Sequence, residues 1–345
     1  MNCMLLAAGK GTRFNPHTKV IAKPALPFLN LPLLCYPLYF LEQLRPNKLL
    51  LNLHHLPQTV IKAVNKVVMD APYKVLFSEE QPLILDSAGG IGKARDELSG
   101  QGNFVVANAD PVMFSGLSFE TFWQFHLDQR ALATIYCVPH SSQTKGFGSV
   151  WTNVDKYVSS IGTAPVAGCE AFHFAGFIAY KDEIFDFIPK DQASRIFADV
   201  LVPAIKNGAQ VNAFVDTSAV WFETGDETNY LYSTLQVLKL LSATNTSRYE
   251  PFLENFFQRF GVQLVQLIDR AWAESGSQVN CELDRETYLF VGANSTIDAS
   301  VKIEGFAVVG PNLHIPSGCL LKNSVIMSDT QLKSGSLTFE NKLIL

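Results

Sequence analysis

The stretch Leu6–Phe14 reads LAAGKGTRF and is followed by Lys23-Pro24. Gly9 and Gly11 let the backbone approach a phosphate chain closely, so that several N–H groups point at its oxygens. Arg13 adds a fork of donors that matches phosphate, and Lys23 adds a second, compact positive charge. A glycine turn with two surface cations is the plainer alternative, but the pattern continues through Lys23-Pro24. The stretch therefore predicts a cradle for a nucleoside triphosphate.

Two better-known phosphate loops do not fit this stretch. A dinucleotide-binding loop needs a third glycine three residues after Gly11, where this chain has Phe14, and Pro16 blocks a helix start. A P-loop closes with Gly-Lys-Ser/Thr at a helix start, whereas Lys10 lies between the two glycines. The stretch is therefore neither a dinucleotide-binding loop nor a P-loop.

The stretch Leu6–Pro27 resembles the signature of the sugar-1-phosphate nucleotidylyltransferases (NDP-sugar pyrophosphorylases). That signature is L-x-A-G-x-G-T-R, then P-x-T, K-P and P, and Pro16 and Thr18 supply its middle part. Members transfer a nucleoside monophosphate from a nucleoside triphosphate to a sugar 1-phosphate and release pyrophosphate. The resemblance is specific for the superfamily, and it names neither the sugar nor the base.

Composition narrows the class of protein. The 345 residues carry a net charge of −5 without a basic tract, which argues against nucleic acid as a partner. The six cysteines are isolated, so reduced thiols in a cytoplasm fit better than a disulfide scaffold or a zinc site. We expect no signal peptide, and the apolar region Val20–Leu44 is broken by four prolines, which argues against a membrane span.

Up to about residue 140, short apolar runs alternate with amphipathic stretches. The expected strands are Asn2–Leu6, Lys48–Leu53, Tyr73–Phe77, Phe104–Asn108 and Ala131–Val138. The expected helices are Leu33–Leu44, Gln58–Val68, Gly90–Leu98 and Phe119–Gln129. The next expected elements are strands Ser149–Thr152, Ala171–Tyr180 and Gln210–Asp216 and a helix Ser194–Lys206. This alternation predicts an α/β fold with a doubly wound, mixed and mainly parallel sheet.

The tail carries a different pattern, with an interval of six residues. The repeated positions are Val291, Ile297, Ile303, Val309, Ile315, Leu321 and Met327. Each of the first six is followed four residues later by Ser295, Val301, Ala307, Leu313, Cys319 or Val325. Such hexads are typical of a left-handed parallel β-helix, and many members of the resembled family carry one. We expect a catalytic domain at 1–240, a helical connector at 241–286 (with helices at Asn229–Leu241 and Tyr249–Ala273) and a short left-handed β-helix at 287–345.

Two acidic residues are candidates for a metal site. Asp110 follows the apolar strand in FVVANADP, at the strand end where ligands of doubly wound sheets bind. A turn-capping aspartate is the commoner case in isolation, but the resemblance implies a magnesium-binding aspartate here. The family's second ligand is an aspartate in W-x-D-x-G, and this chain has Glu223 there. The resemblance therefore implies Mg²⁺ held by Asp110 and Glu223.

The resemblance also assigns residues to the nucleotide and the sugar. Glu79–Ile91 resembles the base-reading loop, although an N-cap at Ser87 before a glycine-opened helix is an alternative. The implied nucleotide-binding residues are Leu6, Ala8, Gly9, Gly11, Thr12, Arg13, Glu80, Ser87, Ala88 and Gly89. Gly148 and Gly176 match positions where backbone approaches the sugar. The family's Glu-Lys-Pro segment, which holds sugar hydroxyls and phosphate, is missing.

We therefore expect a magnesium-dependent nucleotidylyltransferase with Arg13 and Lys23 as catalytic residues. Its partners are a nucleoside triphosphate and a sugar 1-phosphate, and a homo-oligomer would form through the β-helix or the helical connector. A non-catalytic regulatory or nucleotide-sugar-binding subunit of the same fold is the alternative, because Glu-Lys-Pro is missing and Glu223 replaces aspartate. An acyltransferase built on the β-helix is the weakest alternative, since only His314 could act as a base.

Overall fold

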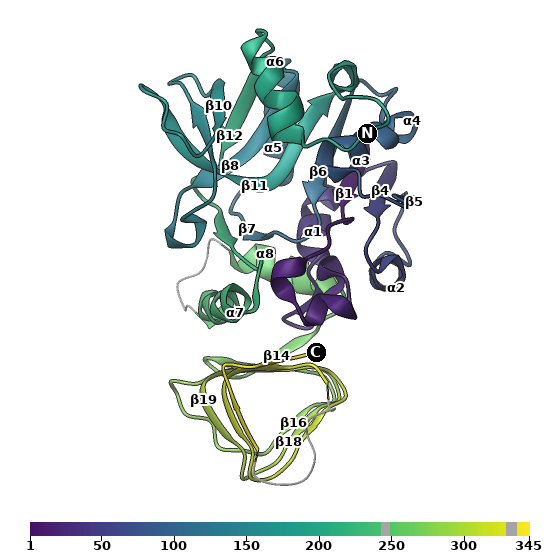
Figure 1. Cartoon of the computed structure of the whole chain (residues 1–345). Coiled ribbons are helices and arrows are strands. Elements are labelled where there is room, and N and C mark those ends of the chain that lie inside the picture. Colours follow the sequence, from purple (N-terminus) through teal and green to yellow (C-terminus); the bar gives the residue numbers. More distant parts are fainter. Residues whose placement is uncertain (243–248, 329–336) are drawn as a thin grey trace. The chain divides into compact units, whose positions relative to one another are not determined.

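The computed structural model describes residues 1–242, 249–328 and 337–345. The predicted connector and tail include 243–248 and 329–336, which lie outside the described residues. The chain forms two compact units (Figure 1). Unit 1 comprises Met1–Thr12, Thr18–Ala25 and Leu33–Glu223, and unit 2 comprises Arg13–His17, Leu26–Pro32 and Thr224–Leu345.

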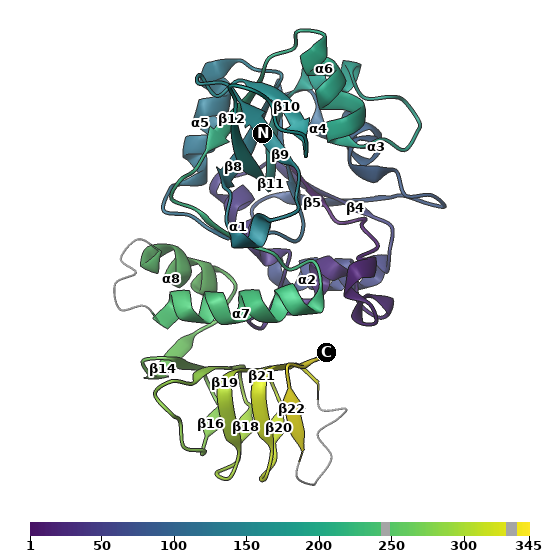
Figure 2. The same cartoon turned by 60° about the vertical axis from the view of Figure 1, so that its left-hand side comes forward.

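Unit 1 is built on a mixed sheet whose described strands follow the order β10-β9-β11-β6-β1-β4-β5, with β8 and β12 joined through β11. The strands are β1 (Asn2–Leu6), β4 (Lys48–Leu53), β5 (Lys74–Glu79), β6 (Asn103–Asn108), β8 (Ala133–Pro139), β9 (Ser149–Thr152), β10 (Val158–Gly162), β11 (Glu170–Lys181) and β12 (Val211–Val215). Strands β6, β1, β4 and β5 pair in parallel, and β11 pairs antiparallel with β6, β8 and β9 (Figure 2). The predicted fold class is confirmed.

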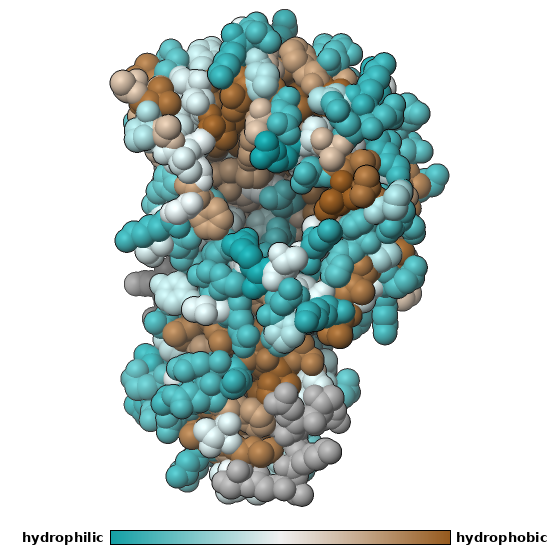
Figure 3. Space-filling view, in the orientation of Figure 1, coloured by the Kyte–Doolittle hydropathy of each residue, from teal (hydrophilic) through white to brown (hydrophobic). Residues whose placement is uncertain are grey.

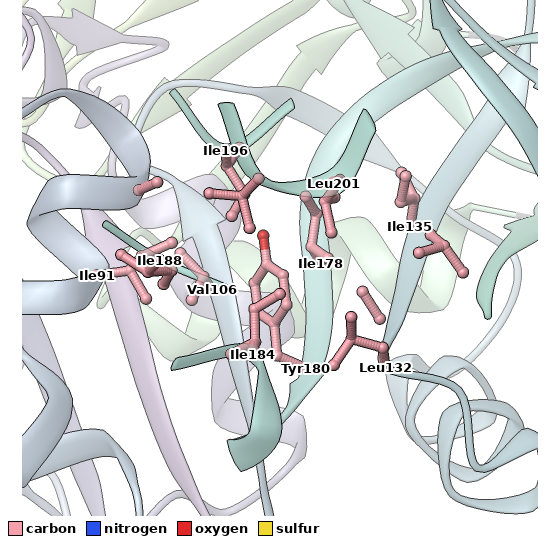
Figure 4. Close-up of a cluster of buried hydrophobic side chains, with 14 of the residues drawn as sticks. Ile91, Val106, Leu132, Ile135, Ile178, Tyr180, Ile184, Ile188, Ile196 and Leu201 are labelled. Carbon is pink, nitrogen blue, oxygen red and sulfur yellow. The ribbon is translucent and has the colours of Figure 1, made fainter. Parts of the chain in front are cut away.

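The helices of unit 1 match the amphipathic stretches of the sequence. They are α1 (Cys35–Gln43), α2 (Pro57–Val67), α3 (Asp86–Lys93), α4 (Arg95–Leu98), α5 (Phe119–Gln129), the π-helical turn Ile196–Leu201 and α6 (Val202–Lys206). Apolar side chains from α3, the π-helical turn and the sheet form one buried cluster that includes Ile91, Val106, Ile178 and Ile196 (Figure 4). The short strands β7 (Val112–Phe114) and β13 (Val220–Phe222) form a separate antiparallel pair.

The register of the central strands fixes where the glycine loop begins. Leu6, the last residue of β1, lies opposite Asn52 of β4 and Asn108 of β6. The three parallel strands therefore end together, and the loop that starts at Ala7 leaves from their carboxyl edge. This is the edge at which doubly wound sheets bind their ligands.

A buried histidine makes the stability of unit 1 sensitive to acid. His126 of α5 is 1% exposed and bonds Thr134 through Nδ1 at 2.8 Å and Asn103 through Nε2 at 3.1 Å. Burial, followed by the charge of Lys181, lowers the pKa of His126 to about 4. At pH values between about 4 and the ordinary pKa of about 6.5, His126 is protonated in the unfolded chain but neutral in the folded chain.

The free energy of unfolding should therefore fall as the pH drops from 6.5 towards 4. Each pKa unit corresponds to about 1.4 kcal/mol, so the loss amounts to about 2–3 kcal/mol. Urea unfolding at pH 7 and pH 4.5 would measure it, with His126→Gln expected to lose less than the wild type and the exposed His314→Gln to lose as much. Equal losses in the wild type and His126→Gln would contradict this assignment.

Unit 2 begins with a small hairpin and two helices. They are β2 (Pro27–Phe28) with β3 (Leu31–Pro32), α7 (Glu227–Ser242) and α8 (Glu250–Arg259). The predicted helix Tyr249–Ala273 is correct only in its first part, because β14 (Leu264–Ile268) pairs antiparallel with β15 (Ala271–Glu274). Strand β15 then pairs in parallel with β17 (Tyr288–Val291). The helix prediction was wrong there because residues 264–273 extend the sheet of the tail.

The tail consists of stacked parallel strands. They are β16 (Gln278–Val279), β17, β18 (Thr296–Ile297), β19 (Lys302–Val309), β20 (His314–Ile315), β21 (Leu320–Ile326), β22 (Thr338–Glu340) and β23 (Leu343–Ile344). Val291 pairs with Val309 and Ile297 with Ile315, so these coils take 18 residues, or three hexads. Val309 pairs with Ile326, so the next coil is one residue shorter at this side. Figure 1 looks along these coils, whose strands form the sides of a prism. The stacking is consistent with the predicted β-helix.

Six of the seven predicted hexad positions lie in or against the buried cluster of the prism. The seventh, Met327, was wrong by one residue, because the register shifts between β19 and β21 and Ile326 takes its place. Val291, Ile297, Val309, Ile315 and Leu321 are fully buried, whereas Ile303 is partly buried against the same cluster. Ile315→Asp should unfold the tail, since a carboxylate inside the prism would have no partner and would cost several kcal/mol. A calorimetric melt would measure the loss, and Lys302→Asp, at an exposed position of β19, is the control. An unchanged melt for Ile315→Asp would refute the inward orientation.

Candidate active site

The glycine loop after β1 is held by bonds from neighbouring strands and from its own far end. The backbone N–H of Ala7 donates to Asn52 Oδ1 at 2.8 Å. Gly11 has a φ of +62°, and a Cβ there would lie 3.0 Å from Thr18 Cγ2 and 3.2 Å from Lys23 Cβ. Thr18 Oγ1 donates to the Gly11 carbonyl at 2.9 Å. Only glycine suits this turn, whereas Gly9 is exposed with open space around its missing Cβ.

Glu80 supports the glycine loop indirectly, through its hydrogen bond with Asn52. Its side chain is buried, and Oε1 accepts from Asn52 Nδ2 at 2.7 Å while Oε2 accepts from the Leu85 N–H at 2.8 Å. A Cβ at Gly90 would lie 2.6 Å from Glu80 Oε1, so the glycine is needed for close approach. One carboxylate oxygen therefore fixes Asn52, which holds the glycine loop, and the other fixes the residue before α3. Sequence reasoning placed Glu80 at the nucleotide and missed Asn52, because the pairing of β1 with β4 was not visible in the sequence.

The predicted base-reading residues lie at the start of α3. The N–H groups of Ala88 and Gly89 both donate to the Ser194 carbonyl, at 2.8 and 3.2 Å. Ser87 Oγ accepts from the Ile196 N–H at 2.9 Å. A Cβ at Gly89 would lie 2.7 Å from the Gln192 carbonyl oxygen. These groups hold the segment before the π-helical turn, and their contact with a base stays a prediction.

Lys23 and Asp110 form an ion pair. Lys23 Nζ lies 2.6 Å from Asp110 Oδ2, and the Lys23 side chain is 11% exposed while that of Asp110 is 36% exposed. The pair joins the end of the glycine loop to the end of β6. The sequence predicted a role for each residue but not their contact, which only the fold creates.

The strand pair β7–β13 brings the two predicted metal ligands to the same end. Phe222 lies opposite Val112, so Asp110 and Glu223 both stand just beyond this last pair. Glu223 is 6% exposed, and its N–H donates to Gln143 Oε1 at 3.0 Å. Among the residues that the structure describes, three or more His, Cys, Asp and Glu side chains nowhere gather as a metal centre. Two carboxylates and the phosphates of a nucleotide together fit a hard cation such as Mg²⁺.

Arg13 is exposed and stands in the short helical turn Thr12–Phe14. The neighbouring Phe14 is buried and belongs to unit 2, where its ring packs edge-to-face on Tyr230 of α7 with centroids 5.6 Å apart. The ring of Phe28 also packs edge-to-face on Tyr230, with ring centroids 5.2 Å apart. The segment that carries Arg13 is thereby anchored on α7, which the sequence did not predict.

The predicted sugar-side glycines lie on β11 and before β9. Gly176 has a φ of +102°, and a Cβ there would lie 2.8 Å from Pro111 Cγ, so β11 passes close to the residue after Asp110. Gly148 is exposed and faces Gly162. His173 is buried, its ring centroid lies 4.3 Å from that of Trp221, and neither of its nitrogens has a partner in the described residues. His173 is thus a packed strand residue.

Comparison with known families settles the class of the chain. Residues 2–239 match the model of the nucleotidyl transferase family. The chain belongs to this family. The match spans β1 through most of α7 and therefore includes the glycine loop, Lys23, Asp110 and Glu223.

Two relatives are consistent with the family assignment, and one solved structure shows the same fold. The UTP–glucose-1-phosphate uridylyltransferase of Synechocystis sp. is 26% identical over 350 residues, covering 97% of this chain and 85% of the relative. A probable mannose-1-phosphate guanylyltransferase 2 of Oryza sativa subsp. japonica is 22% identical, with 98% of both chains covered. HddC from Yersinia pseudotuberculosis shares the fold, with a TM-score of 0.55 and 24% identity over 68% of this chain and 99% of HddC. The predicted family and enzyme class are confirmed.

Proposed function

We propose that this nucleotidyl transferase uses Mg²⁺ to transfer a nucleoside monophosphate from a nucleoside triphosphate to a sugar 1-phosphate. One observation carries the proposal above the others. The glycine loop, Lys23 and Asp110 meet at the carboxyl edge of β1 and β6, with Lys23 Nζ 2.6 Å from Asp110 Oδ2. A loop of backbone N–H groups, one cation and one carboxylate at a single sheet edge suit the polyphosphate of a nucleotide.

In this reaction an oxygen of the sugar 1-phosphate attacks the α-phosphorus of the nucleotide. A bond forms between that oxygen and the α-phosphorus, the bond from the α-phosphorus to the bridging oxygen breaks, and pyrophosphate leaves with the electron pair. The step needs no protein nucleophile, so positioning and charge neutralisation carry it. The backbone of Gly9–Thr12 and the side chain of Arg13 would hold the leaving phosphates.

Lys23 would neutralise charge at the α-phosphate or the acceptor phosphate. Its ammonium donates to Asp110 Oδ2, which places it between the glycine loop and the end of β6. Asp110 and Glu223 would hold Mg²⁺, which neutralises phosphate charge and acts as a Lewis acid when bound. Asn52 holds the start of the glycine loop through the Ala7 N–H, and Glu80 holds Asn52.

The remaining expectations belong to the same proposal. A cytoplasmic enzyme without nucleic acid as a partner fits the charge and cysteine pattern. A homo-oligomer would form through the tail or the helices that precede it. Among the residues that the structure describes, no helix has the length and apolar character needed to cross a membrane.

Incubation of the purified protein with each nucleoside triphosphate and a panel of sugar 1-phosphates tests the function. Pyrophosphate release that requires both substrates and Mg²⁺ is the expected result. Tight nucleotide binding without pyrophosphate release from any pair would instead support the non-catalytic alternative.

A further inference from the structure

Unit 1 contains a cavity of about 360 Å³ next to the proposed reaction centre. Leu6 and Asn108, which end β1 and β6, line it, and so does Gly176 of β11. Asn108 stands two residues before Asp110, and Gly176 contacts Pro111. A volume of this size lies within the range of small-molecule pockets, which is about 300–1,000 Å³. The lining includes Leu6 and Ser87 from the predicted nucleotide side and Gly176 from the predicted sugar side, so the cavity lies where the two substrates would meet. Its size suits the sugar of an acceptor whose phosphate reaches Lys23.

The walls of the cavity are mainly apolar. Aliphatic side chains come from Leu6, Val106, Ile178 and Ile196, and two phenylalanines complete the wall. Figure 4 shows Val106, Ile178 and Ile196 around Tyr180, and Figure 3 shows hydrophobic residues at the surface near α6 and β11. An ordinary hexose presents hydroxyls in every direction. Each hydroxyl buried against such a wall without a partner would cost about 1–3 kcal/mol.

The two phenylalanines form a fixed aromatic corner. Phe174 of β11 and Phe197 of the π-helical turn pack edge-to-face, with ring centroids 5.0 Å apart and planes at 90°. Both rings are only partly buried, so part of their surface faces the cavity. Such a corner gains free energy from covering a methyl or acyl group.

The polar side chains of the lining belong to Ser87, Asn108, Tyr180 and Arg195, and those of Ser87 and Arg195 are engaged with other residues. Ser87 Oγ accepts from the Ile196 N–H, and Arg195 forms an ion pair with Asp199 at 3.4 Å. The Tyr180 ring is 1% exposed, and burial raises the pKa of its hydroxyl well above the ordinary value, so it can act only as a neutral group. The chain also has Gly162-Thr163-Ala164-Pro165 where Glu-Lys-Pro is expected, so that pair of charges is not available for sugar hydroxyls.

We propose that this cavity selects a sugar 1-phosphate carrying an apolar substituent, a methyl or acyl group, where common hexose 1-phosphates carry a hydroxyl. Phe174 and Phe197 are the specificity-determining residues. The inference rests on the proposed function, since it assigns the cavity to the acceptor of that reaction.

The test compares matched acceptors that differ in one substituent. Glucose 1-phosphate is set against 6-deoxyglucose 1-phosphate and N-acetylglucosamine 1-phosphate, and the same series is run on mannose. At least one methyl- or acyl-bearing acceptor should exceed its parent tenfold or more in kcat/KM, which is about what one apolar group contributes in a fitted pocket. Phe174→Asn and Phe197→Asn should lower that ratio about tenfold, mainly through KM, whereas Phe174→Leu should keep it.

Phe187→Asn, at a 41% exposed position outside the cavity, is the matched control and should leave the ratio unchanged. Melting curves confirm that each variant is folded, and saturation-transfer NMR on the acceptor methyl groups reports binding without turnover. Pyrophosphate release with equal preference for the parent hexoses, unaffected by Phe174→Asn and Phe197→Asn, would overturn the cavity inference and leave the proposed function standing. The opposite outcome is a saturation-transfer signal on the acceptor methyl group that is lost in Phe174→Asn and Phe197→Asn, with no pyrophosphate released from any substrate pair. It would support binding in the cavity and overturn the proposed reaction.

Discussion

Asp110→Asn should lower turnover by about 100-fold or more, which is the usual cost of removing one preorganised charge from a reaction centre. An amide neither neutralises the Lys23 ammonium, 2.6 Å away, nor binds a hard cation as a carboxylate does. Calorimetric titration of nucleotide with and without Mg²⁺ gives a readout apart from turnover. The wild type should bind nucleotide more tightly with Mg²⁺, and Asp110→Asn should lose most of that difference.

Variants of Glu223 distinguish a metal site with two carboxylate ligands from one with Asp110 alone. Glu223→Gln should weaken both the magnesium dependence and turnover, although no more than Asp110→Asn does. Glu223→Asp should keep substantial activity if the longer side chain reaches the ion directly. Full activity of Glu223→Gln at the same magnesium optimum would leave Asp110 as the sole protein ligand.

Arg13→Ala should lower turnover by about 100-fold while weakening nucleotide binding much less. The reason is that the guanidinium would contact the leaving phosphates mainly as their charge grows in the transition state. Stopped assays of kcat, together with equilibrium nucleotide binding, separate the two effects. Lys19→Ala removes another exposed cation from the same loop and should leave both quantities unchanged.

Equal losses of binding and turnover in Arg13→Ala would assign the residue to ground-state binding only. Unchanged turnover in a folded Arg13→Ala protein would remove Arg13 from the mechanism. Because Phe14 anchors this segment on Tyr230, a melting curve is needed to show that α7 remains intact.

The sheet was predictable from sequence because its strands are short apolar runs separated by amphipathic helices. The predicted strand Asn2–Leu6 matches β1, and the predicted helix Phe119–Gln129 matches α5. The hexads were equally clear, since an interval of six over several repeats has no other regular structure. Residues 264–273 were missed because they form the hairpin of β14 and β15, whose second strand pairs with β17 of the tail, and the hexad pattern does not extend over this hairpin.

The candidate site was predictable only where a motif carried it. The glycine loop, Lys23 and Asp110 stand in recognisable segments, whereas Asn52 is an ordinary strand residue until β1 and β4 pair. Glu80 was predicted beside the base, which stays a prediction, and the contacts of its two oxygens with Asn52 Nδ2 and the Leu85 N–H arise only in the fold. The aromatic corner consists of Phe174 from β11 and Phe197 from the π-helical turn. No local sequence pattern predicts that these two rings meet.

Phosphorus-31 NMR of the protein with Mg²⁺, a nucleoside triphosphate and a sugar 1-phosphate tests the central claim most directly. The account predicts that, for at least one pair, both substrates disappear together while a nucleoside diphosphate sugar and pyrophosphate grow in equal amounts. Asp110→Asn should show neither product on the same time scale. Orthophosphate as the only product, or intact substrates for every pair tried, would contradict the account.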